Sequence, residues 1–420
     1  MQTLSTSVAP RTAPTQAPNQ EAPAPFGLYI HIPFCEKKCP YCDFNTYAKL
    51  DNLFDAYIDA LCAELRAWAD RLAHRRVDTI FLGGGTPTVL EAGHLAQIFE
   101  TVNAVFAVAP DCEITSEANP GTVDRAKFAV LRSLGVNRLS MGVQSFQPDE
   151  LAFLGRIHGV DDVYQAFEAA RHTGFDNINL DFIFGLPQQS PEDWADTLHQ
   201  ATALAPDHLS LYSLIVEPNT PLYHWVETGQ VSAPDDDEAG ALYEMAIAHM
   251  GAAGYTHYEV SNWAKDSDQR CRHNLIYWRN QEFLGVGPGA HSYVHAPWRA
   301  DITSGSVTGG IFDGVRWSNR KAVPGYIKRI QSGEPVEAFH EAIDPPTSMG
   351  ESMMLGLRLV QEGIERTRFH HRYGVDILDA YPETVRRFTQ MDLLTVDAER
   401  LRLTQRGLMV GNQVFAEFLA

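Results

Sequence analysis

Three closely spaced cysteines are the residues best suited to chemistry in this sequence. Cys35, Cys39 and Cys42 fall within the segment 29–44, YIHIPFCEKKCPYCDF. Thiolates are soft ligands, and a C-x3-C-x2-C loop can wrap one corner of a [4Fe–4S] cubane and bind three of its irons. No fourth cysteine follows, so one iron stays open to a small molecule, as in catalytic metal sites. We therefore predict that these three cysteines bind a [4Fe–4S] cluster.

A zinc site is the alternative interpretation of the same loop. It would be completed by His31 or by a distant histidine, but zinc motifs usually pair cysteines two by two and no second pair follows. The other cysteines are scattered. We predict that Cys62 and Cys112 are small buried apolar side chains. Cys271 is a weaker candidate for a thiolate ligand.

A glycine-rich segment is the second chemical signal. Residues 81–87 read FLGGGTP and close a strand-like run. Three glycines permit close backbone approach and are expected to expose amide donors. The segment lacks the Gly-Lys-Ser/Thr ending of a P-loop. A glycine-rich turn alone is weak support for a ligand site, so its place in the fold decides its meaning.

The elements around these segments predict an α/β fold. Strand-like runs at 27–32, 77–82, 112–117, 136–141, 177–184 and 208–214 alternate with helical patterns at 51–74, 91–107, 122–134, 149–173 and 192–204. Such alternation indicates a parallel sheet with right-handed crossovers, here an incomplete (β/α)6 barrel over residues 26–255. Glu117 and Gln144 end strands, and Asp181 lies on the next one. Chemistry in parallel barrels is assembled at the carboxyl ends of the strands.

The two motifs together resemble a known family. Y-x-H-I-P-F-C-x3-C-x-Y-C followed by G-G-G-T-P is similar to the radical S-adenosylmethionine (radical SAM) enzymes, in the branch of the oxygen-independent coproporphyrinogen III oxidases and the HemW-type haem chaperones. The resemblance covers about residues 26–420. It implies that SAM chelates the open iron through its amino and carboxylate groups. It also implies that one electron from a donor, passed through the cluster, cleaves SAM to a 5'-deoxyadenosyl radical.

The resemblance also implies roles for individual residues. The methionyl amino end of SAM would be received by Gly84, Gly85 and Thr86, and a ribose hydroxyl by Glu117. Further SAM contacts would come from Gln144, Arg156 and Asp181, and Tyr29 and Tyr41 would flank the cluster and the cofactor. Arg156 is the natural partner of the SAM carboxylate, because a guanidinium can donate two parallel hydrogen bonds to it.

Two local features favour a haem chaperone over an oxidase. The oxidase branch typically has a further cysteine after C-x3-C-x2-C-x, and Phe44 stands at that place. Residues 273–278 read HNLIYW, and H-N-x-x-Y-W resembles the haem-associated signature of the chaperones. We therefore predict haem contacts by His273, Asn274, Tyr277 and Trp278, since imidazole is a good axial ligand and aromatic rings offer an apolar face.

Three functions remain open at this point. The favoured one is a radical SAM protein that binds haem and transfers it to recipient proteins. The alternative is an oxygen-independent coproporphyrinogen III oxidase, an enzyme of porphyrin metabolism. The third is a radical SAM enzyme with an unrelated substrate.

The remaining segments complete the predicted organisation. Residues 1–25 are rich in Ala and Pro and predict a disordered tail. Residues 256–344 form an extension that carries the H-N-x-x-Y-W motif. Residues 345–420 predict a mainly helical, winged-helix-like domain with a hairpin at 393–403. That domain holds nine Arg, no Lys and ten acidic residues, so DNA binding is disfavoured.

Composition narrows the environment of the protein. The 420 residues include 45% hydrophobic side chains and carry a net charge of -20, which repels nucleic acid. No apolar run reaches the roughly 18 residues of a membrane span, which leaves at most peripheral membrane contact. The N-terminus lacks a basic region followed by an apolar stretch, so we expect a cytoplasmic protein.

Overall fold

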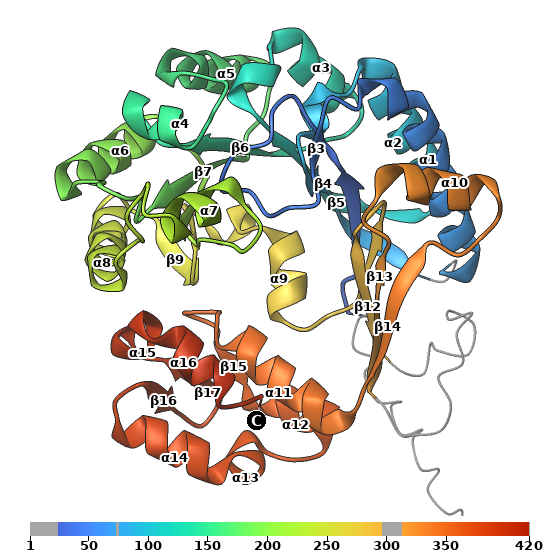
Figure 1. The fold of residues 1–420 in the computed structure, drawn as a ribbon. Helices are drawn as coiled ribbons and strands as arrows, with labels where there is room; N and C mark the ends of the chain where they lie inside the picture. The colour runs from blue at the N-terminus through green and yellow to red at the C-terminus, as the bar shows by residue number, and fades with distance from the viewer. Residues whose placement is uncertain (1–23, 73–74, 296–312, 420) are drawn as a thin grey trace, which may run out of the picture.

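A single twelve-stranded sheet organises the computed structural model, which describes residues 24–72, 75–295 and 313–419 (Figure 1). Its centre is the predicted series of parallel strands: β1 (Gly27–Ile32), β4 (Arg76–Gly84), β5 (Ala107–Ala118), β6 (Arg138–Gln144), β7 (Ile178–Phe184) and β8 (His208–Ser213). These strands are neighbours in chain order. Leu28, Ile30 and Ile32 are all fully buried, as expected for a parallel strand covered on both faces. The incomplete α/β barrel is confirmed.

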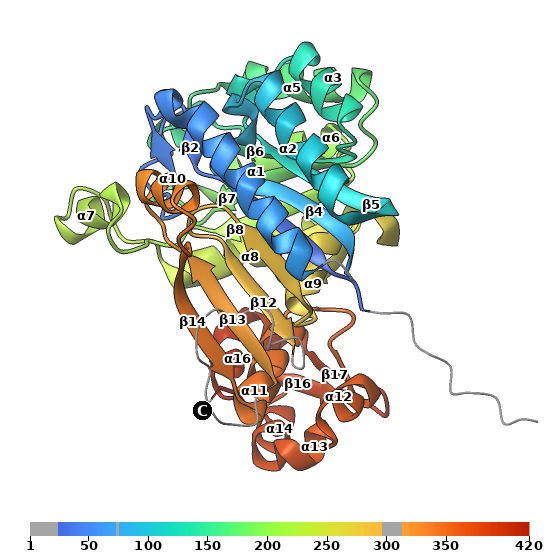
Figure 2. The ribbon, with the colours of Figure 1, turned by 90° about the vertical axis from the view of Figure 1, so that its right-hand side faces the viewer.

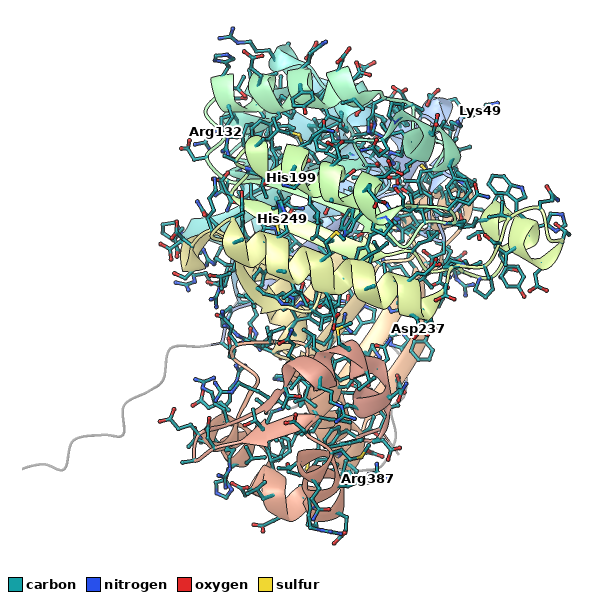
Figure 3. The ribbon with its side chains drawn as sticks, turned by 90° about the vertical axis from the view of Figure 1, so that its left-hand side faces the viewer. Lys49, Arg132, His199, Asp237, His249 and Arg387 are labelled. Carbon is teal, nitrogen blue, oxygen red and sulfur yellow. The ribbon has the colours of Figure 1, made fainter. Side chains whose placement is uncertain are left out.

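Helices cover the outer face of the parallel strands. They are α1 (Phe54–Arg71), α2 (Ala92–Val105), α3 (Arg125–Ser133), α5 (Val160–His172), α6 (Pro191–Ala203) and α8 (Asp236–Ala252). Figure 3 shows α6 and α8 side by side, with His199 on one and His249 on the other; their ring centroids are 4.6 Å apart. Short 3-10 turns lie at Asp51–Leu53, Pro87–Val89, Pro120–Thr122 and Ser267–Gln269.

The single helix predicted over 149–173 is wrong. The chain forms α4 (Pro148–Phe153), breaks, and resumes as α5. Gly155 has φ +68°, which ends the first helix. The second helix starts where the Gly159 amide donates to Asp162 Oδ2 at 2.8 Å. The break carries Arg156 to the end of the barrel at which the strands terminate.

The extension adds strands to both edges of the same sheet. Next to β8 lie β10 (Asn262–Ala264) and β9 (Thr256–Glu259), both antiparallel. Next to β1 lies β11 (Phe283–Val286), which pairs in parallel, followed by antiparallel β12 (His291–His295), β13 (Gly314–Asn319) and β14 (Glu337–Ile343). Between the two edges the chain forms α9 (Arg272–Trp278), and α10 (Val323–Gln331) packs on α1.

The C-terminal residues form a separate small unit below the barrel (Figure 2). Its helices are α11 (Pro345–Gly356), α12 (Arg366–Tyr373), α13 (Ile377–Ala380), α14 (Pro382–Gln390), α15 (Gln405–Met409) and α16 (Gly411–Ala416). They pack with a three-stranded antiparallel sheet of β15 (Ile364–Glu365), β17 (Arg400–Leu403) and β16 (Leu394–Val396). This unit has its own apolar core, which includes Leu357, Phe388 and Leu401. The predicted helical, winged-helix-like domain with its hairpin is confirmed.

Two small features border the barrel opening. Strands β2 (Phe34–Cys35) and β3 (Tyr47–Ala48) pair in parallel and hold the two ends of the cysteine loop together. Helix α7 (Pro221–Glu227) projects from the body of the molecule (Figure 2). In the part of the chain that the structure describes, no helix has both the length and the apolar character to cross a membrane. The tail predicted at 1–25 lies, except for its last two residues, outside the described residues.

Candidate functional site

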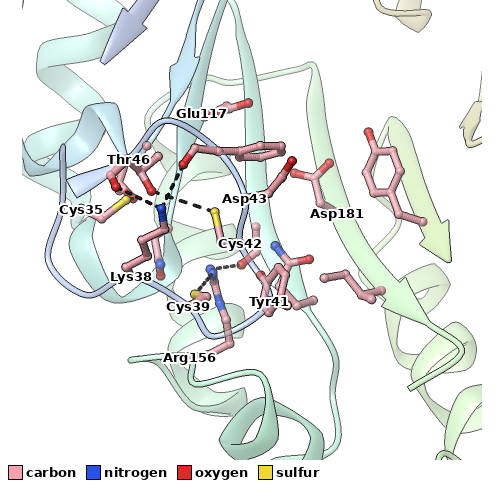
Figure 4. Close-up of a pocket in the computed structure, with 18 of the residues that line it drawn as sticks. Cys35, Lys38, Cys39, Tyr41, Cys42, Asp43, Thr46, Glu117, Arg156 and Asp181 are labelled. Carbon is pink, nitrogen blue, oxygen red and sulfur yellow. Dashed lines mark hydrogen bonds between the residues drawn. The ribbon is translucent and has the colours of Figure 1, made fainter. Parts of the chain in front are cut away.

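A cavity of about 420 Å³ opens where the parallel strands end (Figure 4). We call it the rim cavity. It is lined by the cysteine loop, the glycine segment and the ends of β5 to β8. It brings together eleven residues singled out from the sequence: Cys35, Cys39, Tyr41, Cys42, Gly84, Gly85, Thr86, Glu117, Gln144, Arg156 and Asp181. Segments up to 146 residues apart in the chain therefore share one space, as the strand-end rule predicts.

Each thiol of the loop lies near one polar side chain. Cys35 Sγ lies 3.6 Å from Thr86 Oγ1, Cys42 Sγ 4.0 Å from Thr46 Oγ1, and Cys39 Sγ 3.4 Å from a guanidinium nitrogen of Arg156 (Figure 4). Burial raises the pKa of the Cys35 and Cys42 thiols. Both must therefore lose a proton before they bind metal, so metal binding is expected to depend on pH.

The ligand geometry bears on the choice between zinc and a cluster. Among the described residues, no three His, Cys, Asp or Glu side chains are grouped as the ligands of a single ion. A cubane instead takes its cysteine ligands at separate corners. His31 is also engaged, since its Nδ1 lies 3.0 Å from Tyr29 Oη and its Nε2 lies 2.9 Å from the Asn45 carbonyl. This arrangement favours the cluster.

Distant segments brace the cysteine loop. The Asn45 side-chain amide donates to the carbonyl of Pro288 at 2.8 Å and to that of Lys321 at 3.0 Å. Within the loop, Lys38 Nζ donates to the carbonyls of Phe44 at 3.1 Å and Thr46 at 3.3 Å. These contacts fix the position of the loop relative to the barrel.

The glycine segment packs directly against the end of β1 and the residues that follow it. A Cβ at Gly84, whose φ is +107°, would lie 2.3 Å from His31, and a Cβ at Gly85 would lie 2.5 Å from the Phe34 carbonyl oxygen. The predicted exposure of amide donors is wrong. The Gly84 amide donates to Glu117 Oε2 at 2.9 Å, the Gly85 amide to the Ile32 carbonyl at 2.8 Å, and the Thr86 amide to the Phe34 carbonyl at 2.7 Å. The glycines are needed for close approach.

Two carboxyl groups face the rim cavity from neighbouring parts of the sheet. Burial and the nearby Asp181 carboxylate raise the pKa of Glu117 to about 8. Burial also raises the pKa of Asp181, opposed by hydrogen bonds from Asn179 Nδ2 at 2.8 Å and Ser140 Oγ at 3.0 Å. Two acids in one buried region cannot both ionise freely. The raised pKa of Glu117 therefore favours its protonated form at neutral pH.

Arg156 has hydrogen-bonding capacity left over. One Nη donates to the Gly142 carbonyl at 2.7 Å and the other to Cys39, but within the described part of the chain its buried Nε has no partner. A buried unsatisfied donor is costly unless a ligand or water completes it. Beside it, Gln144 has φ +75° where the β6–β7 register shifts, an uncommon conformation for a non-glycine residue. Both residues line the rim cavity.

The other predicted residues lie deeper in the barrel or outside it. An adjoining space of about 220 Å³, here the inner cavity, is lined by Tyr29, His273, Asn274 and Tyr277 and shares Glu117, Ser140, Asp181 and Tyr212 with the rim cavity. Trp278 lines neither cavity. It lies against the C-terminal unit, with the Arg358 guanidinium 4.6 Å from its ring centroid.

His273 is buried, with 1% of its surface exposed. Its Nδ1 lies 2.7 Å from Thr79 Oγ1 and its Nε2 lies 2.8 Å from Tyr277 Oη. Burial and the nearby Arg138 guanidinium lower its pKa to about 3, so the imidazole is neutral. Its role as a haem ligand stays a prediction, and it would require one of these hydrogen bonds to break.

Several lining residues had escaped the sequence analysis. Lys37 and Lys38 lie between the cysteines, and Tyr212 and Ile215 lie at and after the end of β8. The rule that sites form at the carboxyl ends of parallel strands applies equally to β8. The residues at its end were missed because only polar side chains were considered. Cys62, Cys112 and Cys271 are buried, as predicted for the first two. Burial raises the pKa of Cys271 to about 12, which disfavours a thiolate there.

Comparisons with known proteins agree with this geometry. The Radical SAM superfamily model matches residues 29–201, and the HemN C-terminal domain model matches residues 343–410. The haem chaperone HemW of Bacillus subtilis is 37% identical over 93% of this chain and 98% of its own length. The HemW of Escherichia coli is 44% identical over 65% of this chain and 71% of its own. The solved structure of coproporphyrinogen III oxidase (HemN) from Escherichia coli superposes with a TM-score of 0.78, covering 94% of this chain and 90% of that one at 23% identity.

The fold and the cysteine loop thus define a radical SAM protein with a HemN-type C-terminal domain. Within this class, the chain belongs to the family of the HemW relatives. Membership implies a [4Fe–4S] cluster and SAM. The residues fit both groups, because three thiols border one cavity and the unpartnered Nε of Arg156 suits a carboxylate.

Proposed function

We propose that this chain is a haem chaperone with a radical SAM core. It binds a [4Fe–4S] cluster through Cys35, Cys39 and Cys42, holds SAM in the rim cavity, and binds haem and passes it to recipient proteins. The grouping of three thiols, two carboxyl groups and a guanidinium around one cavity carries the cofactor part of this proposal. The names of relatives that match nearly the whole chain support the haem part.

When bound, the reduced cluster supplies an electron to the sulfonium of SAM. The chain's own residues bind and orient the cofactor. Arg156 donates to the methionyl carboxylate, Glu117 accepts from a ribose hydroxyl once it has lost its proton, and Gln144 and Asp181 complete the polar contacts. Tyr41 covers the loop side, and Gly84, Gly85 and Thr86 leave room for the methionyl amino end. An external electron donor is required to reduce the cluster.

Haem titration of anaerobically reconstituted protein, followed by incubation with an apo-haem protein, tests the proposal. We expect a Soret shift on haem addition and transfer of that absorbance to the recipient on separation. Protein that neither binds haem nor loads the recipient would contradict it.

The alternative function is oxygen-independent oxidation of coproporphyrinogen III. The similarity of fold to the solved oxidase is compatible with this function. Phe44, at the place of a further cysteine, argues against it. Anaerobic incubation with SAM, a reductant and coproporphyrinogen separates the two. Conversion to protoporphyrinogen would establish the oxidase.

A further inference from the structure

We propose that haem binds against an apolar wall at the exposed side of the rim cavity, and not at the H-N-x-x-Y-W motif. The wall consists of Phe44, Ile183, Tyr212, Leu214 and Ile215, which all line the rim cavity. This inference rests on the proposed haem chaperone function and assigns the place where haem is held.

Exposure of apolar surface is concentrated at this wall. Phe44 is 61% exposed, Ile215 66% and Tyr212 41%. The described residues include nine large apolar side chains with such exposure, and three of them come together here from two distant segments. Single exposed apolar residues are ordinary, but several that line one cavity point to a binding surface.

The wall has a firm backing. Ile183 and Leu214 belong to a buried apolar cluster with Leu154, Leu186 and Leu222, and Tyr41 packs against that cluster. The Leu222 amide donates to the Pro40 carbonyl at 3.0 Å, which ties α7 to the cysteine loop, and the Leu214 amide donates to the Phe184 carbonyl at 2.8 Å. The buried part of the wall, Ile183 and Leu214, is therefore held in packed structure, which suits a flat, rigid ligand.

The rim cavity offers two lysines to the propionates of a porphyrin, although the acids Asp43 and Glu217 line it as well. Lys37 and Lys38 line the same cavity in a chain whose net charge is -20. Lys38 is held by two backbone carbonyls, and Lys37, which is exposed, has no hydrogen bond or ion pair with any described residue. A macrocycle against Phe44 and Ile215 would have cations at hand for its carboxylates.

The motif around His273 lacks these properties. Both imidazole nitrogens already have partners, and the side chain is buried on the side of α9 that faces Thr79 of β4. No histidine is among the described residues that line the rim cavity. Haem at the wall would thus be retained by apolar contact and by its propionates, with one face left open. Such loose retention suits a protein that must release its cargo.

Haem titration by Soret absorbance, with cluster content measured in parallel, tests the site. We expect Ile215→Asp and Phe44→Asp each to weaken haem binding about tenfold or more, because a charge would be buried under the macrocycle. Phe339→Asp is the matched control, since Phe339 is 47% exposed on β14, away from the cavity, and its titration should match the parent. Iron and sulfide content should be unchanged in all three variants.

The Tyr277→Phe variant distinguishes haem binding at the wall from haem binding at the H-N-x-x-Y-W motif. It frees the Nε2 of His273 and should leave haem binding unchanged if haem sits on the wall. Wall variants that bind haem like the parent, or a Tyr277→Phe variant with altered haem affinity or spectrum, would overturn the inference while leaving the chaperone function intact. A parent protein that binds no haem at all would instead refute the proposed function itself.

Discussion

The rim cavity and the inner cavity share four lining residues, yet they differ in what they leave available. In the rim cavity, the Nε of Arg156 and the ammonium of Lys37 have no partner among the described residues, and Phe44 and Ile215 are exposed. Around the inner cavity, His273 has both nitrogens engaged, and the spare donor is the buried Nε of Arg138, which lacks a partner among the described residues. A motif identifies residues that have a role. Whether that role is to bind a ligand depends on which hydrogen-bonding groups and apolar surfaces remain unpaired after folding.

The α9 helix shows what the segment around His273 does in the fold. Its N-terminus is capped by Glu113, whose Oε1 accepts from the His273 amide at 2.9 Å and whose Oε2 accepts from the Arg272 amide at 3.0 Å. Beyond its C-terminus, Arg279 makes two hydrogen bonds to Glu362 of the C-terminal unit, at 2.9 and 2.6 Å. The helix therefore joins the base of the barrel to that unit, so we expect its motif to serve stability.

The largest effect should come from the rim. Cys35→Ser removes one of three cluster ligands, so the reconstituted protein should lose its brown absorbance and nearly all iron and sulfide, against about four of each in the parent. Cys62→Ala is the control, because Cys62 is buried in the core and should leave the cluster intact. Stoichiometric zinc without sulfide in protein purified without oxygen would refute the cluster assignment.

The next largest effect concerns protein stability and tests the role of His273 beside the inner cavity. His273→Ala leaves Thr79 and Tyr277 without a partner and opens a small cavity, so the free energy of unfolding should fall by about 3 kcal/mol. Denaturant unfolding of cluster-free protein measures it, and exposed His172→Ala should change stability by less than about 0.5 kcal/mol. Unchanged stability combined with lost haem binding would show that His273 binds haem and does not serve stability.

SAM binding tests the spare capacity of Arg156. Arg156→Ala removes a charge-assisted hydrogen bond worth about 1.5 to 3 kcal/mol, so SAM affinity measured by calorimetry should drop about 10- to 100-fold. Asp181→Ala should weaken it over the same range. Arg387→Ala, on the exposed surface of the C-terminal unit, is the control. Equal SAM affinity in parent, Arg156→Ala and Asp181→Ala would show that SAM binds elsewhere.

The last effect is a pH dependence. Glu117 has a pKa of about 8 in the folded protein, well above the ordinary value of about 4.3. Between these values the folded state binds a proton that the unfolded state has lost, so stability should decrease as pH rises from about 5 to 8. Glu117→Gln should remove most of that decrease in denaturant titrations. Asp70→Asn, which replaces an exposed acid, is the control and should show the same change of stability with pH as the parent. The same change in Glu117→Gln would mean that Glu117 is already ionised and would contradict the prediction.

Local patterns predicted the strands and the rim residues well. Runs such as 27–32 and 178–184 are apolar enough to identify a buried parallel strand, and the strand-end rule then groups Glu117, Gln144 and Asp181. Long-range pairing could not be predicted in this way. The parallel pairing of β11 with β1 and the burial of His273 against Thr79 depend on segments about 200 to 250 residues apart. The break before α5 depends on Gly155, which the helical periodicity concealed.

The bracing of the cysteine loop has a consequence for biogenesis. All three cysteines emerge early in synthesis, yet Asn45 is held by Pro288 and Lys321, and β1 completes its pairing only with β11. Ordering contacts of such long sequence separation is slow, since a large loop must close before they form. A ribosome-bound chain that ends before residue 288 therefore presents its thiols on an unbraced loop. Cluster insertion is expected to follow synthesis of the segment that contains Pro288 and Lys321, which makes iron–sulfur loading a late step of maturation.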